Sequence, residues 1–568
     1  MALTRRALGG LTIGGSAAAA LAACGGNEDE GGGGGGSKEV VWAISSGWAA
    51  WNMNTNDGNN SYTNQALTPM NPLGQVGYDF DPDGEVFHDD AIFAGPPELV
   101  SEEPMAVKHV LNENAQWSDG KPIRLEDFIF QWYSMSGNPD HANQEKAVPA
   151  SIDWGSNVVS IEQDEDGAIV TTYAEGYVNP EWQFSGGVYL PSHLAEENGF
   201  ENWQSDPEVM GDAIEWFNVT PPTVGSGPYV PVEAKLGEYV VYEPNENYQG
   251  SVKPKLKKLT LKVVEGTPAI VTELRQGSIA GSWPSDFSEE EIAKAKEDPA
   301  LVTEVYNGSV WVHIDANVNN QFLSDVALRQ AVFTAINVQD IIDKNFPETD
   351  VSPKGSHFFS EGGPYYVDHV GPTGQGSGDA DAARQILTDA GYTWNDDDKL
   401  VSPDGEVVTF NIRYGETDAI RQTASELAQS YLAEIGIDLE LVNIPDADLG
   451  NVLAGSDFDL IIFGWSGNPE FTVAPGQFFN SGSSSNYGNY DNPEADEAVG
   501  KVRSTLDIDE AAEFANEADA IVVADAYTLP LFDEPQSIMY NSELITGVHV
   551  NGNTQSGPIY NVREWDTP

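Results

Sequence analysis

The sequence predicts an α/β fold that is large enough for two or three domains. The chain has 568 residues, and a single core seldom serves more than about 250 to 300 residues. Apolar residues make up 40% of the chain and include 14 Trp, 21 Tyr and 22 Phe, which can fill sizeable cores. Segments with the pattern of strands alternate along the chain with segments that carry a helical apolar stripe.

The first 23 residues have the pattern of an export signal. Arg5 and Arg6 precede a run rich in Gly and Ala that is too short for a comfortable transmembrane helix. The segment around these arginines is similar to a twin-arginine signal, and the general secretory route stays open as the alternative. Residues 21–24, Leu-Ala-Ala-Cys, resemble the lipobox of bacterial lipoproteins, in which the cysteine is acylated. An ordinary secretory peptide with a chance cysteine is the other interpretation.

Cys24 is the only cysteine in the sequence, so the exported chain has neither disulfides nor thiolate metal sites. We expect residues 24–37, with six consecutive glycines, to form a flexible tether after the lipidated Cys24. The lipid would anchor the protein to the outer face of the plasma membrane.

The charge balance is strongly acidic, with 90 Asp and Glu against 26 Lys and Arg and a net charge of -64. Such a chain repels nucleic acid, which binds to clustered Lys and Arg. It also repels an anionic membrane, so the lipid would have to supply the attachment. We interpret the charge as a halophile-like solvated surface.

We predict that molar NaCl raises the melting temperature, because salt screens the repulsion between like charges on the folded surface. Thermal denaturation at low and high NaCl checks this expectation. An unchanged melting temperature would contradict it.

The first strand is expected at residues 39–44, followed by a polar loop that carries Trp48 and Trp51. Aromatic side chains beside Asn at the end of a strand occur in sugar- and peptide-binding clefts, although most such loops are only connections. Two Asp-Gly turns, at 81–84 and 164–167, lack the ligand spacing of a calcium loop and predict β-hairpins.

The middle of the chain continues this alternation. A Gly-Ser-Gly-Pro-Tyr turn at 225–229 has glycines that allow a sharp reversal and a proline that fixes the exit direction. No Lys-Ser or Lys-Thr follows, so it is not a phosphate-binding loop. The expected elements are strands at 107–111, 238–242 and 259–263, a turn at 118–122, and helices at 125–135 and 267–277.

The second half begins with a strand and a helix capped near Ser324 and Asp325. An apolar run at 457–463 predicts a fully buried strand, whose exit loop opens at the carboxyl end, where α/β sheets place ligands. The expected elements are strands at 311–317, 437–442, 457–463 and 527–532, and helices at 324–332, 381–390, 419–435 and 509–525.

Read in order, these segments resemble the bacterial extracellular solute-binding proteins of family 5, the oligopeptide- and dipeptide-binding components of ABC importers. The resemblance rests on Val-Lys…Trp-Ser-Asp-Gly-Lys-Pro-Ile…Glu-Asp-Phe at 107–128, the turn at 225–229 with Asn-Glu-Asn-Tyr at 245–248, the helix at 324–332, the helix that Gly391 ends, and Gly464-Trp465. It implies a two-lobed, periplasmic-binding-protein-like fold of class II, cluster C type, with an extra subdomain in the first lobe.

The resemblance also implies a division of the chain. We expect a signal peptide at 1–23, the tether at 24–37, lobe I at 38–60 and 215–305, its extra subdomain at 61–214, lobe II at 306–524, and a return to lobe I at 525–568. Crossings between the lobes are expected near Tyr306 and Asp525, where the lobes would close over a ligand.

The resemblance implies that the Gly464-Trp465 loop touches the ligand. In peptide-binding relatives, an Asp three residues after this Trp pairs with the amino terminus of the peptide. Asn468 stands there in this chain, and an amide gives an ammonium no charge-assisted bond. The predicted ligand-binding residues are Trp465, Gly464, Ser466, Gly467, Asn468, Glu470, Trp48, Trp51, Ser282 and Trp283, the last two near the position of an Asp that this chain lacks.

The sequence carries no catalytic motif: it has no G-x-S-x-G elbow and no H-E-x-x-H, and its eight His residues lack ligand spacing. We therefore expect a binding protein without cofactor or metal, although carboxylate pairs leave a glycosidase formally open. The expected partners are a peptide or other small solute, and the permease and ATPase subunits of an importer. We expect a monomer.

A second binding hypothesis differs in kind. The entry at 51–65 and the Trp-Ser-Asp-Gly variant at 117–120 are similar to an actinobacterial branch of the family. One type of member there is tied to lipoglycan assembly in the cell envelope. Under this hypothesis the cleft binds a glycolipid precursor and takes no part in import.

Overall fold

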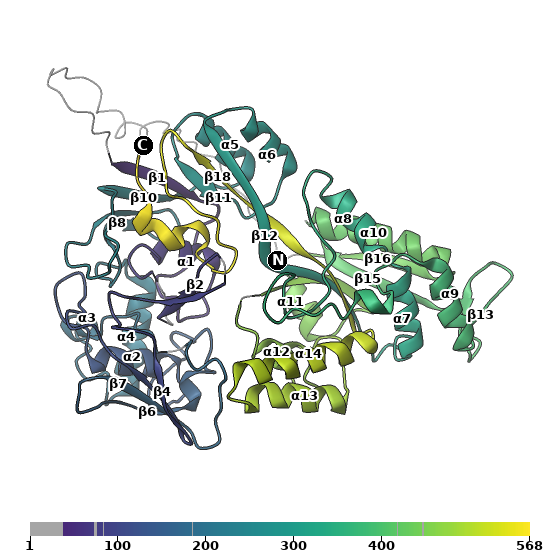
Figure 1. Cartoon of the computed structure of the whole chain (residues 1–568), viewed down its shortest axis with the longest axis horizontal. Helices are drawn as coiled ribbons and strands as arrows, with labels where there is room; N and C mark the ends of the chain where they lie inside the picture. Colours follow the sequence, from purple (N-terminus) through teal and green to yellow (C-terminus); the bar gives the residue numbers. More distant parts are fainter. Residues whose placement is uncertain are drawn as a thin grey trace, which may run out of the picture. The chain divides into compact units, whose positions relative to one another are not determined.

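A ten-stranded mixed sheet runs through residues 38–568 and organises the two lobes (Figure 1). Its strand order is β16-β15-β17-β12-β18-β11-β1-β10-β9-β8. The bounds are β16 Asp438–Ile444, β15 Thr409–Gly415, β17 Leu460–Ser466, β12 Leu301–Ala316, β18 Thr528–Asn541, β11 Gly281–Trp283, β1 Glu39–Ile44, β10 Lys258–Val263, β9 Tyr239–Pro244 and β8 Tyr229–Lys235.

This computed structural model describes residues 38–72, 77–82, 84–184, 186–416, 418–445, 448–467 and 469–568. The predicted signal peptide, the tether, Cys24 and Asn468 lie outside the described residues. No helix in the described part of the chain is long and apolar enough to cross a membrane.

The two longest strands join the lobes. In lobe II, β17 pairs with β12 from Val310 onward, and in lobe I, β11 pairs with β18 at Met539 and Tyr540. Between these points β12 and β18 pair mainly with each other, and their register shifts between Asn307 and Trp311. We call residues 303–310 and 533–538 the crossing ribbon. The predicted two-lobed α/β fold is confirmed.

The crossing expected near Tyr306 lies in this ribbon, where Tyr306 pairs with Gln536. The other crossing is expected near Asp525, three residues before β18 begins at Thr528. The Asp525 side chain accepts hydrogen bonds from the Tyr490 hydroxyl and the Asn492 amide, both at 2.7 Å. The predicted domain bounds remain predictions.

A smaller sheet forms the core of the extra subdomain. It has the order β4-β5-β7-β6 and packs against α2. Both Asp-Gly turns close hairpins, as predicted: Phe80 pairs with Val86, and Gln163 pairs with Ile169. The elements of this region are α1 Ser61–Leu67, β2 Tyr78–Phe80, β3 Val86–His88, β4 Glu98–Glu102, β5 Met105–His109, α2 Leu125–Met135, β6 Val158–Gln163, β7 Ile169–Tyr173, α3 Ser192–Glu197 and α4 Pro207–Val219.

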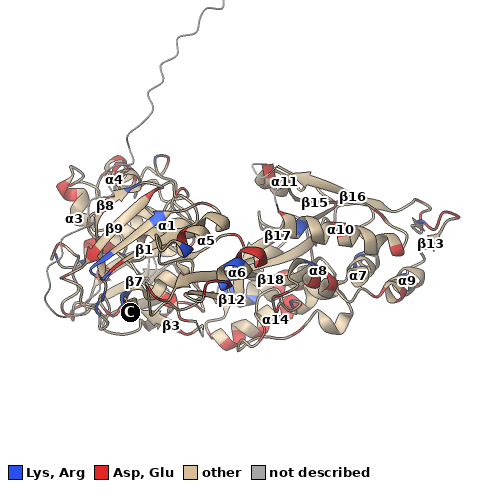
Figure 2. Cartoon of the chain, turned by 90° about the horizontal axis from the view of Figure 1, so that it is seen from above, with Lys and Arg blue, Asp and Glu red and all other residues tan. Residues whose placement is uncertain are grey.

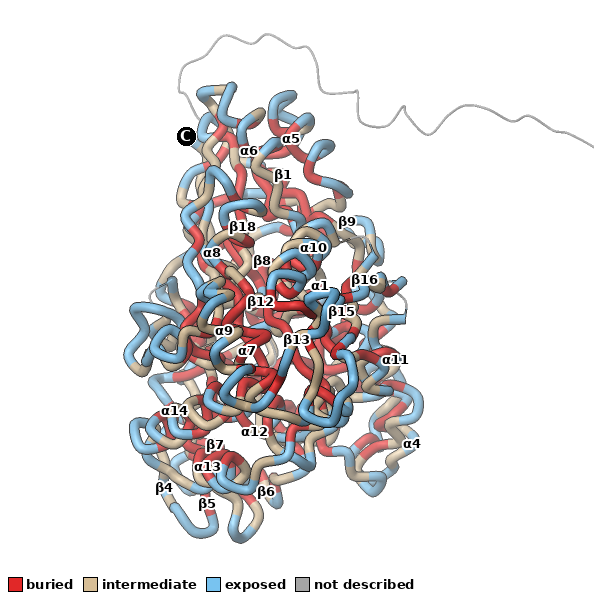
Figure 3. Tube along the Cα trace, turned by 90° about the vertical axis from the view of Figure 1, so that its right-hand side faces the viewer, coloured by how far each residue is buried: buried red, intermediate tan, exposed pale blue. Residues whose placement is uncertain are grey.

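The remaining helices turn their apolar residues inward, and buried and exposed stretches alternate along the trace (Figure 3). The helix expected at 324–332 begins at Val326, and its cap is Asp325, which accepts a hydrogen bond from the Ala327 amide at 2.9 Å. The elements are α5 Thr267–Arg275, α6 Glu289–Lys296, α7 Val326–Ala335, α8 Val338–Asn345, α9 Ala380–Asp389, β13 Thr393–Trp394, β14 Leu400–Val401, α10 Ala419–Glu434, α11 Leu449–Ala454, α12 Ala474–Phe479, α13 Pro493–Ser504, α14 Ile508–Ala524 and a 3₁₀ helix at Gly557–Glu564.

The turn at 225–229 needs glycine for a different reason from the predicted one. Neither Gly225 nor Gly227 has a positive φ. A Cβ on Gly225 would instead lie 2.4 Å from the Met70 carbonyl oxygen, and one on Gly227 would lie 2.7 Å from the Met70 carbonyl carbon. Close approach of two backbones therefore selects these glycines.

Candidate functional site

The carboxyl ends of the parallel strands of both lobes meet at the crossing ribbon. In lobe I, the last residues of β1, β10 and β11 lie side by side, because Ile44 pairs with Val263 and with Trp283. In lobe II, β15, β16 and β17 are parallel, and Ser466 at the end of β17 pairs with Val310. Open α/β sheets bind ligands outside this edge, so the space beside the ribbon is the candidate binding site.

The exit of β17 brings four predicted ligand-binding residues together. Trp465 is partly buried and stacks on Phe478 at 4.6 Å and on Tyr487 at 5.7 Å between ring centroids. Ser466 and Gly467 are exposed, and the Gly467 amide donates to the Ser309 carbonyl oxygen at 2.6 Å. This bond ties the exit loop to the ribbon.

Arg421, which the sequence analysis did not single out, lies beside Gly464. A Cβ on Gly464 would lie 2.8 Å from a guanidinium nitrogen of Arg421. Asp418 and Glu534 hold this guanidinium, the latter at 3.4 Å, and its side chain keeps 16% of its surface exposed. The sequence could have predicted the position of Arg421. The residue lies in the first turn of α10, the helix that follows the carboxyl end of β15.

Lobe I contributes the other predicted aromatic residues, which are more buried than expected for a polar loop. Trp48 and Trp51 are 4% and 2% exposed and meet edge to face at 5.6 Å. Within the described residues, both indole N–H groups are buried and lack a hydrogen-bond partner. Trp283 is also buried, at the end of β11, and the Ser282 hydroxyl donates to the Ala43 carbonyl oxygen at 3.0 Å. Ser282 is thus bonded within the sheet.

Glu470 does not lie beside Trp465 in the stack but contacts lobe I. Its carboxyl group accepts a hydrogen bond from the Tyr78 hydroxyl. Burial, together with the nearby charge of Glu181, raises the pKa of Glu470 to about 7. No local signal in the sequence could have found this contact, because Tyr78 and Glu470 are 392 residues apart.

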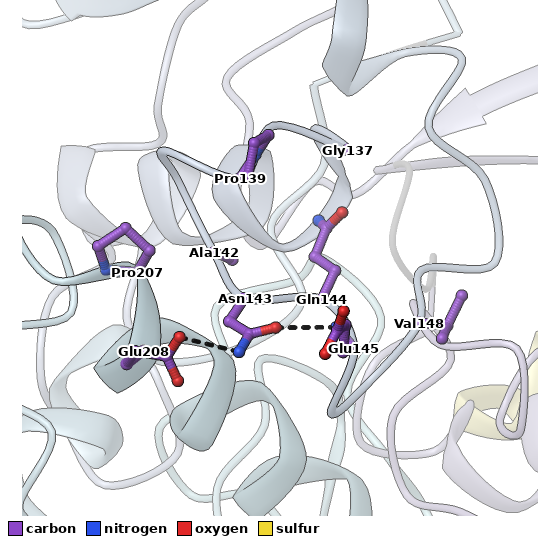
Figure 4. A pocket seen from close by; sticks show the side chains of 9 residues that line it. All are labelled: Gly137, Pro139, Ala142, Asn143, Gln144, Glu145, Val148, Pro207 and Glu208. Carbon is purple, nitrogen blue, oxygen red and sulfur yellow. Dashed lines mark hydrogen bonds between the residues drawn. The ribbon is translucent and has the colours of Figure 1, made fainter.

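A cavity of about 440 Å³ lies in the extra subdomain, away from the strand ends (Figure 4). Asn143 lines this cavity. Its side-chain NH₂ group donates a hydrogen bond to the Glu208 carboxylate at 2.9 Å, and its side-chain oxygen accepts one from the Glu145 amide at 3.1 Å. A smaller cavity of about 30 Å³ beside Trp51 has room for about one water molecule.

A buried Ser, His and Asp lie together in lobe II, but their order is not that of a catalytic triad. Asp519 accepts hydrogen bonds from the Ser356 hydroxyl at 2.7 Å and from His357 Nδ1 at 2.5 Å. In a triad the serine bonds to the histidine, whereas here both bond to the aspartate, and all three are buried. The described residues also contain no group of three or more His, Cys, Asp or Glu that could hold a metal ion.

Comparisons with known proteins agree with this architecture. The chain is 26% identical over 501 residues to the oligopeptide-binding protein OppA of Mycobacterium tuberculosis, covering 86% of this chain and 78% of that protein. It is 22% identical over 471 residues to AppA of Bacillus subtilis, covering 80% and 79%. These relatives are binding proteins.

Two solved structures share the fold. The periplasmic EDTA-binding protein EppA superposes with a TM-score of 0.81 at 26% identity, covering 94% of this chain and 97% of that one. AppA from Bacillus subtilis in complex with a nonapeptide superposes with a TM-score of 0.68 at 19% identity, covering 93% and 99%. The model of the family "Bacterial extracellular solute-binding proteins, family 5 Middle" matches residues 98–489. This chain therefore belongs to the bacterial extracellular solute-binding proteins of family 5.

Proposed function

We propose that this protein captures a peptide, or a related small polar solute, between its two lobes and delivers it to the permease of an ABC importer. The observation that carries the proposal is the meeting of parallel strand ends from both lobes at the crossing ribbon, with Trp465 at the exit of β17. A ligand placed there touches both lobes, and contacts made only in the closed form drive closure.

The polar groups at this edge suit a peptide better than a polyanion such as EDTA. The Arg421 guanidinium is a donor that matches carbonyl and carboxylate oxygens. Asp418 and Glu534 offset the charge of Arg421, so this group adds no net positive charge. Relatives named for oligopeptide binding support the same ligand class.

We further propose that the protein is exported and anchored through an acylated Cys24, as its lipobox-like segment indicates. In this arrangement residues 24–37 tether the binding domain at the outer face of the plasma membrane. The acidic residues lie on elements of both lobes (Figure 2), and they would repel the anionic membrane surface.

We expect Ser466→Trp to weaken ligand binding, with at least a tenfold rise in Kd, and to change the melting temperature little. Ser466 is exposed at the end of β17, so a bulky ring there fills the ligand space without entering the core. Calorimetric titration with a defined peptide mixture and a thermal melt measure the two effects.

Ser430→Trp is the matched control. Ser430 is exposed near the end of α10 that leads into β16, at the opposite edge of the lobe II sheet, so this variant should bind peptides normally. Equal binding by wild type and Ser466→Trp would contradict the proposed site. A co-purifying glycolipid, with no response to any peptide, would favour the envelope-assembly hypothesis.

A further inference from the structure

The lobes also meet beyond the ribbon, through carboxyl groups. Glu181 of lobe I accepts a hydrogen bond from the Phe471 amide of lobe II at 2.8 Å. Its other carboxyl oxygen bonds to the Thr472 hydroxyl. The Tyr78 hydroxyl of lobe I bonds to the Glu470 carboxyl group. Three successive residues after β17 therefore hold lobe I, over sequence separations of about 290 to 392 residues.

Each side of this contact is fixed in its own lobe. Tyr78 stacks on Phe184 at 5.0 Å, and the neighbouring Phe80 carbonyl oxygen accepts a hydrogen bond from the Asn551 amide at 2.8 Å. On the other side, Phe471 packs against Phe359 at 5.1 Å in the core of lobe II. Opening of the lobes would therefore separate Tyr78 from Glu470 rather than unfold either partner.

The surroundings of the contact are acidic and largely shielded from solvent, with Tyr78 and Glu181 buried and Asp79 and Glu470 partly buried. Asp79 lies behind Tyr78, where its carboxylate accepts hydrogen bonds from the Thr554 hydroxyl at 2.7 Å and from the Phe80 amide at 2.9 Å. Within the described residues, no Lys or Arg forms an ion pair with Asp79 or Glu181; the charge of Arg503 acts on Glu181 without such a bond. Three carboxyl groups thus share a buried region in which the negatively charged form is unfavourable.

Burial is the main cause of the resulting shifts. It raises the pKa of Asp79 to about 7 and raises the pKa of Glu181 above its usual value. For Glu470, burial and the Glu181 charge together raise the pKa to about 7. The Tyr78 hydroxyl also has its pKa raised, by burial and then by Glu470, so it stays protonated and can donate.

We propose that Tyr78, Glu181 and Glu470 form a proton-dependent latch that holds the two lobes closed. The proposal rests on the proposed function, because closure matters to a protein that traps its ligand between lobes. When the lobes part, water reaches Glu181 and Glu470, and both carboxyl groups ionise readily. When the lobes close, the pair retains a proton that reduces the repulsion between the two carboxyl groups.

The direction of the pH effect follows from the difference in the pKa of Glu470 between the closed and the open form. Glu470 has a higher pKa in the closed form than its ordinary value of 4.5, so the closed form binds protons more tightly. Closure is then most favourable below pH 4.5 and is lost as the pH rises toward 7. The ratio of closed to open molecules should fall by up to about tenfold per pH unit in that window, and should level off above about pH 8.

Energy transfer between two dyes measures this ratio without ligand. The full chain with Cys24→Ser has no native thiol, so Glu175→Cys in lobe I and Glu513→Cys in lobe II, both exposed, can carry the dyes. We expect transfer to fall between about pH 4.5 and 7 in this background. Glu470→Gln keeps an oxygen for the Tyr78 hydroxyl but cannot ionise, so it should stay closed and lose at least half of the pH dependence.

Glu162→Gln is the matched control, since it removes one exposed carboxylate of lobe I far from the latch and should keep the full pH dependence. The same pH profile in Glu470→Gln and in the parent, or closure that strengthens as the pH rises, would overturn the latch. Peptide titrations at a fixed pH of 6 test the proposed function separately. Loss of peptide binding with an intact pH profile rejects only peptide capture. Normal peptide binding without a pH-dependent profile rejects only the latch.

Discussion

Asp127→Ala is expected to destabilise the protein by about 3 to 5 kcal/mol, the cost of breaking a fully buried polar network. Asp127 is 0% exposed in α2, at the end of the first motif block. One carboxylate oxygen accepts from the Trp117 indole at 3.1 Å and from the Arg124 amide at 3.0 Å. The other accepts from the Ser192 amide at 2.8 Å and from its hydroxyl at 2.6 Å.

The conservative variant sharpens this test. All four partners of Asp127 are donors, so Asp127→Asn would turn an NH₂ group toward two of them and should also destabilise strongly. Glu162→Ala, at an exposed position in β6 of the same subdomain, should change the free energy of unfolding by less than about 0.5 kcal/mol. Denaturant unfolding measures all three variants. An Asp127→Ala protein as stable as Glu162→Ala would refute the network.

Arg329→Ala is expected to cost about 3 to 5 kcal/mol, because it leaves buried carbonyl oxygens without donors. The Arg329 guanidinium in α7 donates to the carbonyl oxygens of Asp525 at 2.7 Å and of Leu323 at 2.7 Å. It donates further to the carbonyl oxygens of Ser324 and Ala526. Asp525 caps the C-terminus of α14, where a cation also stabilises the helix dipole.

The geometry predicts a graded response. Arg329→Lys keeps the charge but has a single nitrogen to offer, so it should recover only part of the lost stability. Arg275→Ala removes an exposed ion pair with Glu297 at 3.3 Å and should cost less than about 1 kcal/mol. Chemical denaturation followed by fluorescence gives the comparison. If Arg329→Lys were fully stable, charge alone would explain the role of Arg329.

These two residues show what the motifs in the sequence encode. Trp117 and Asp127 join the turn and helix of the first block, and Arg329 joins α7 to the end of α14. The glycines of the 225–229 turn fit against the backbone at Met70. The motifs therefore maintain buried contacts of the scaffold, which is why they identify the family and leave the ligand open.

Periodicity and turn chemistry determined most of the elements. The helix at 125–135 and the strand at 39–44 have the predicted bounds, since local apolar patterns and caps define them. The long strands β12 and β18 were predicted only in part, because their ribbon segments carry partly exposed residues and lack a continuous apolar run.

The sequence by itself determined the class of protein, the order of its elements and the strand end that carries Trp465. Tertiary structure alone decided which side chains share that region. Arg421 comes to lie beside Gly464 because β15 and β17 are parallel neighbours, and Glu470 meets Tyr78 and Glu181 across the two lobes. Tyr78 and Glu470 are 392 positions apart, and Arg421 lies beside Gly464 only because β15 pairs with β17, so no local pattern records these contacts. They depend on how the two lobes pack around the β12–β18 ribbon.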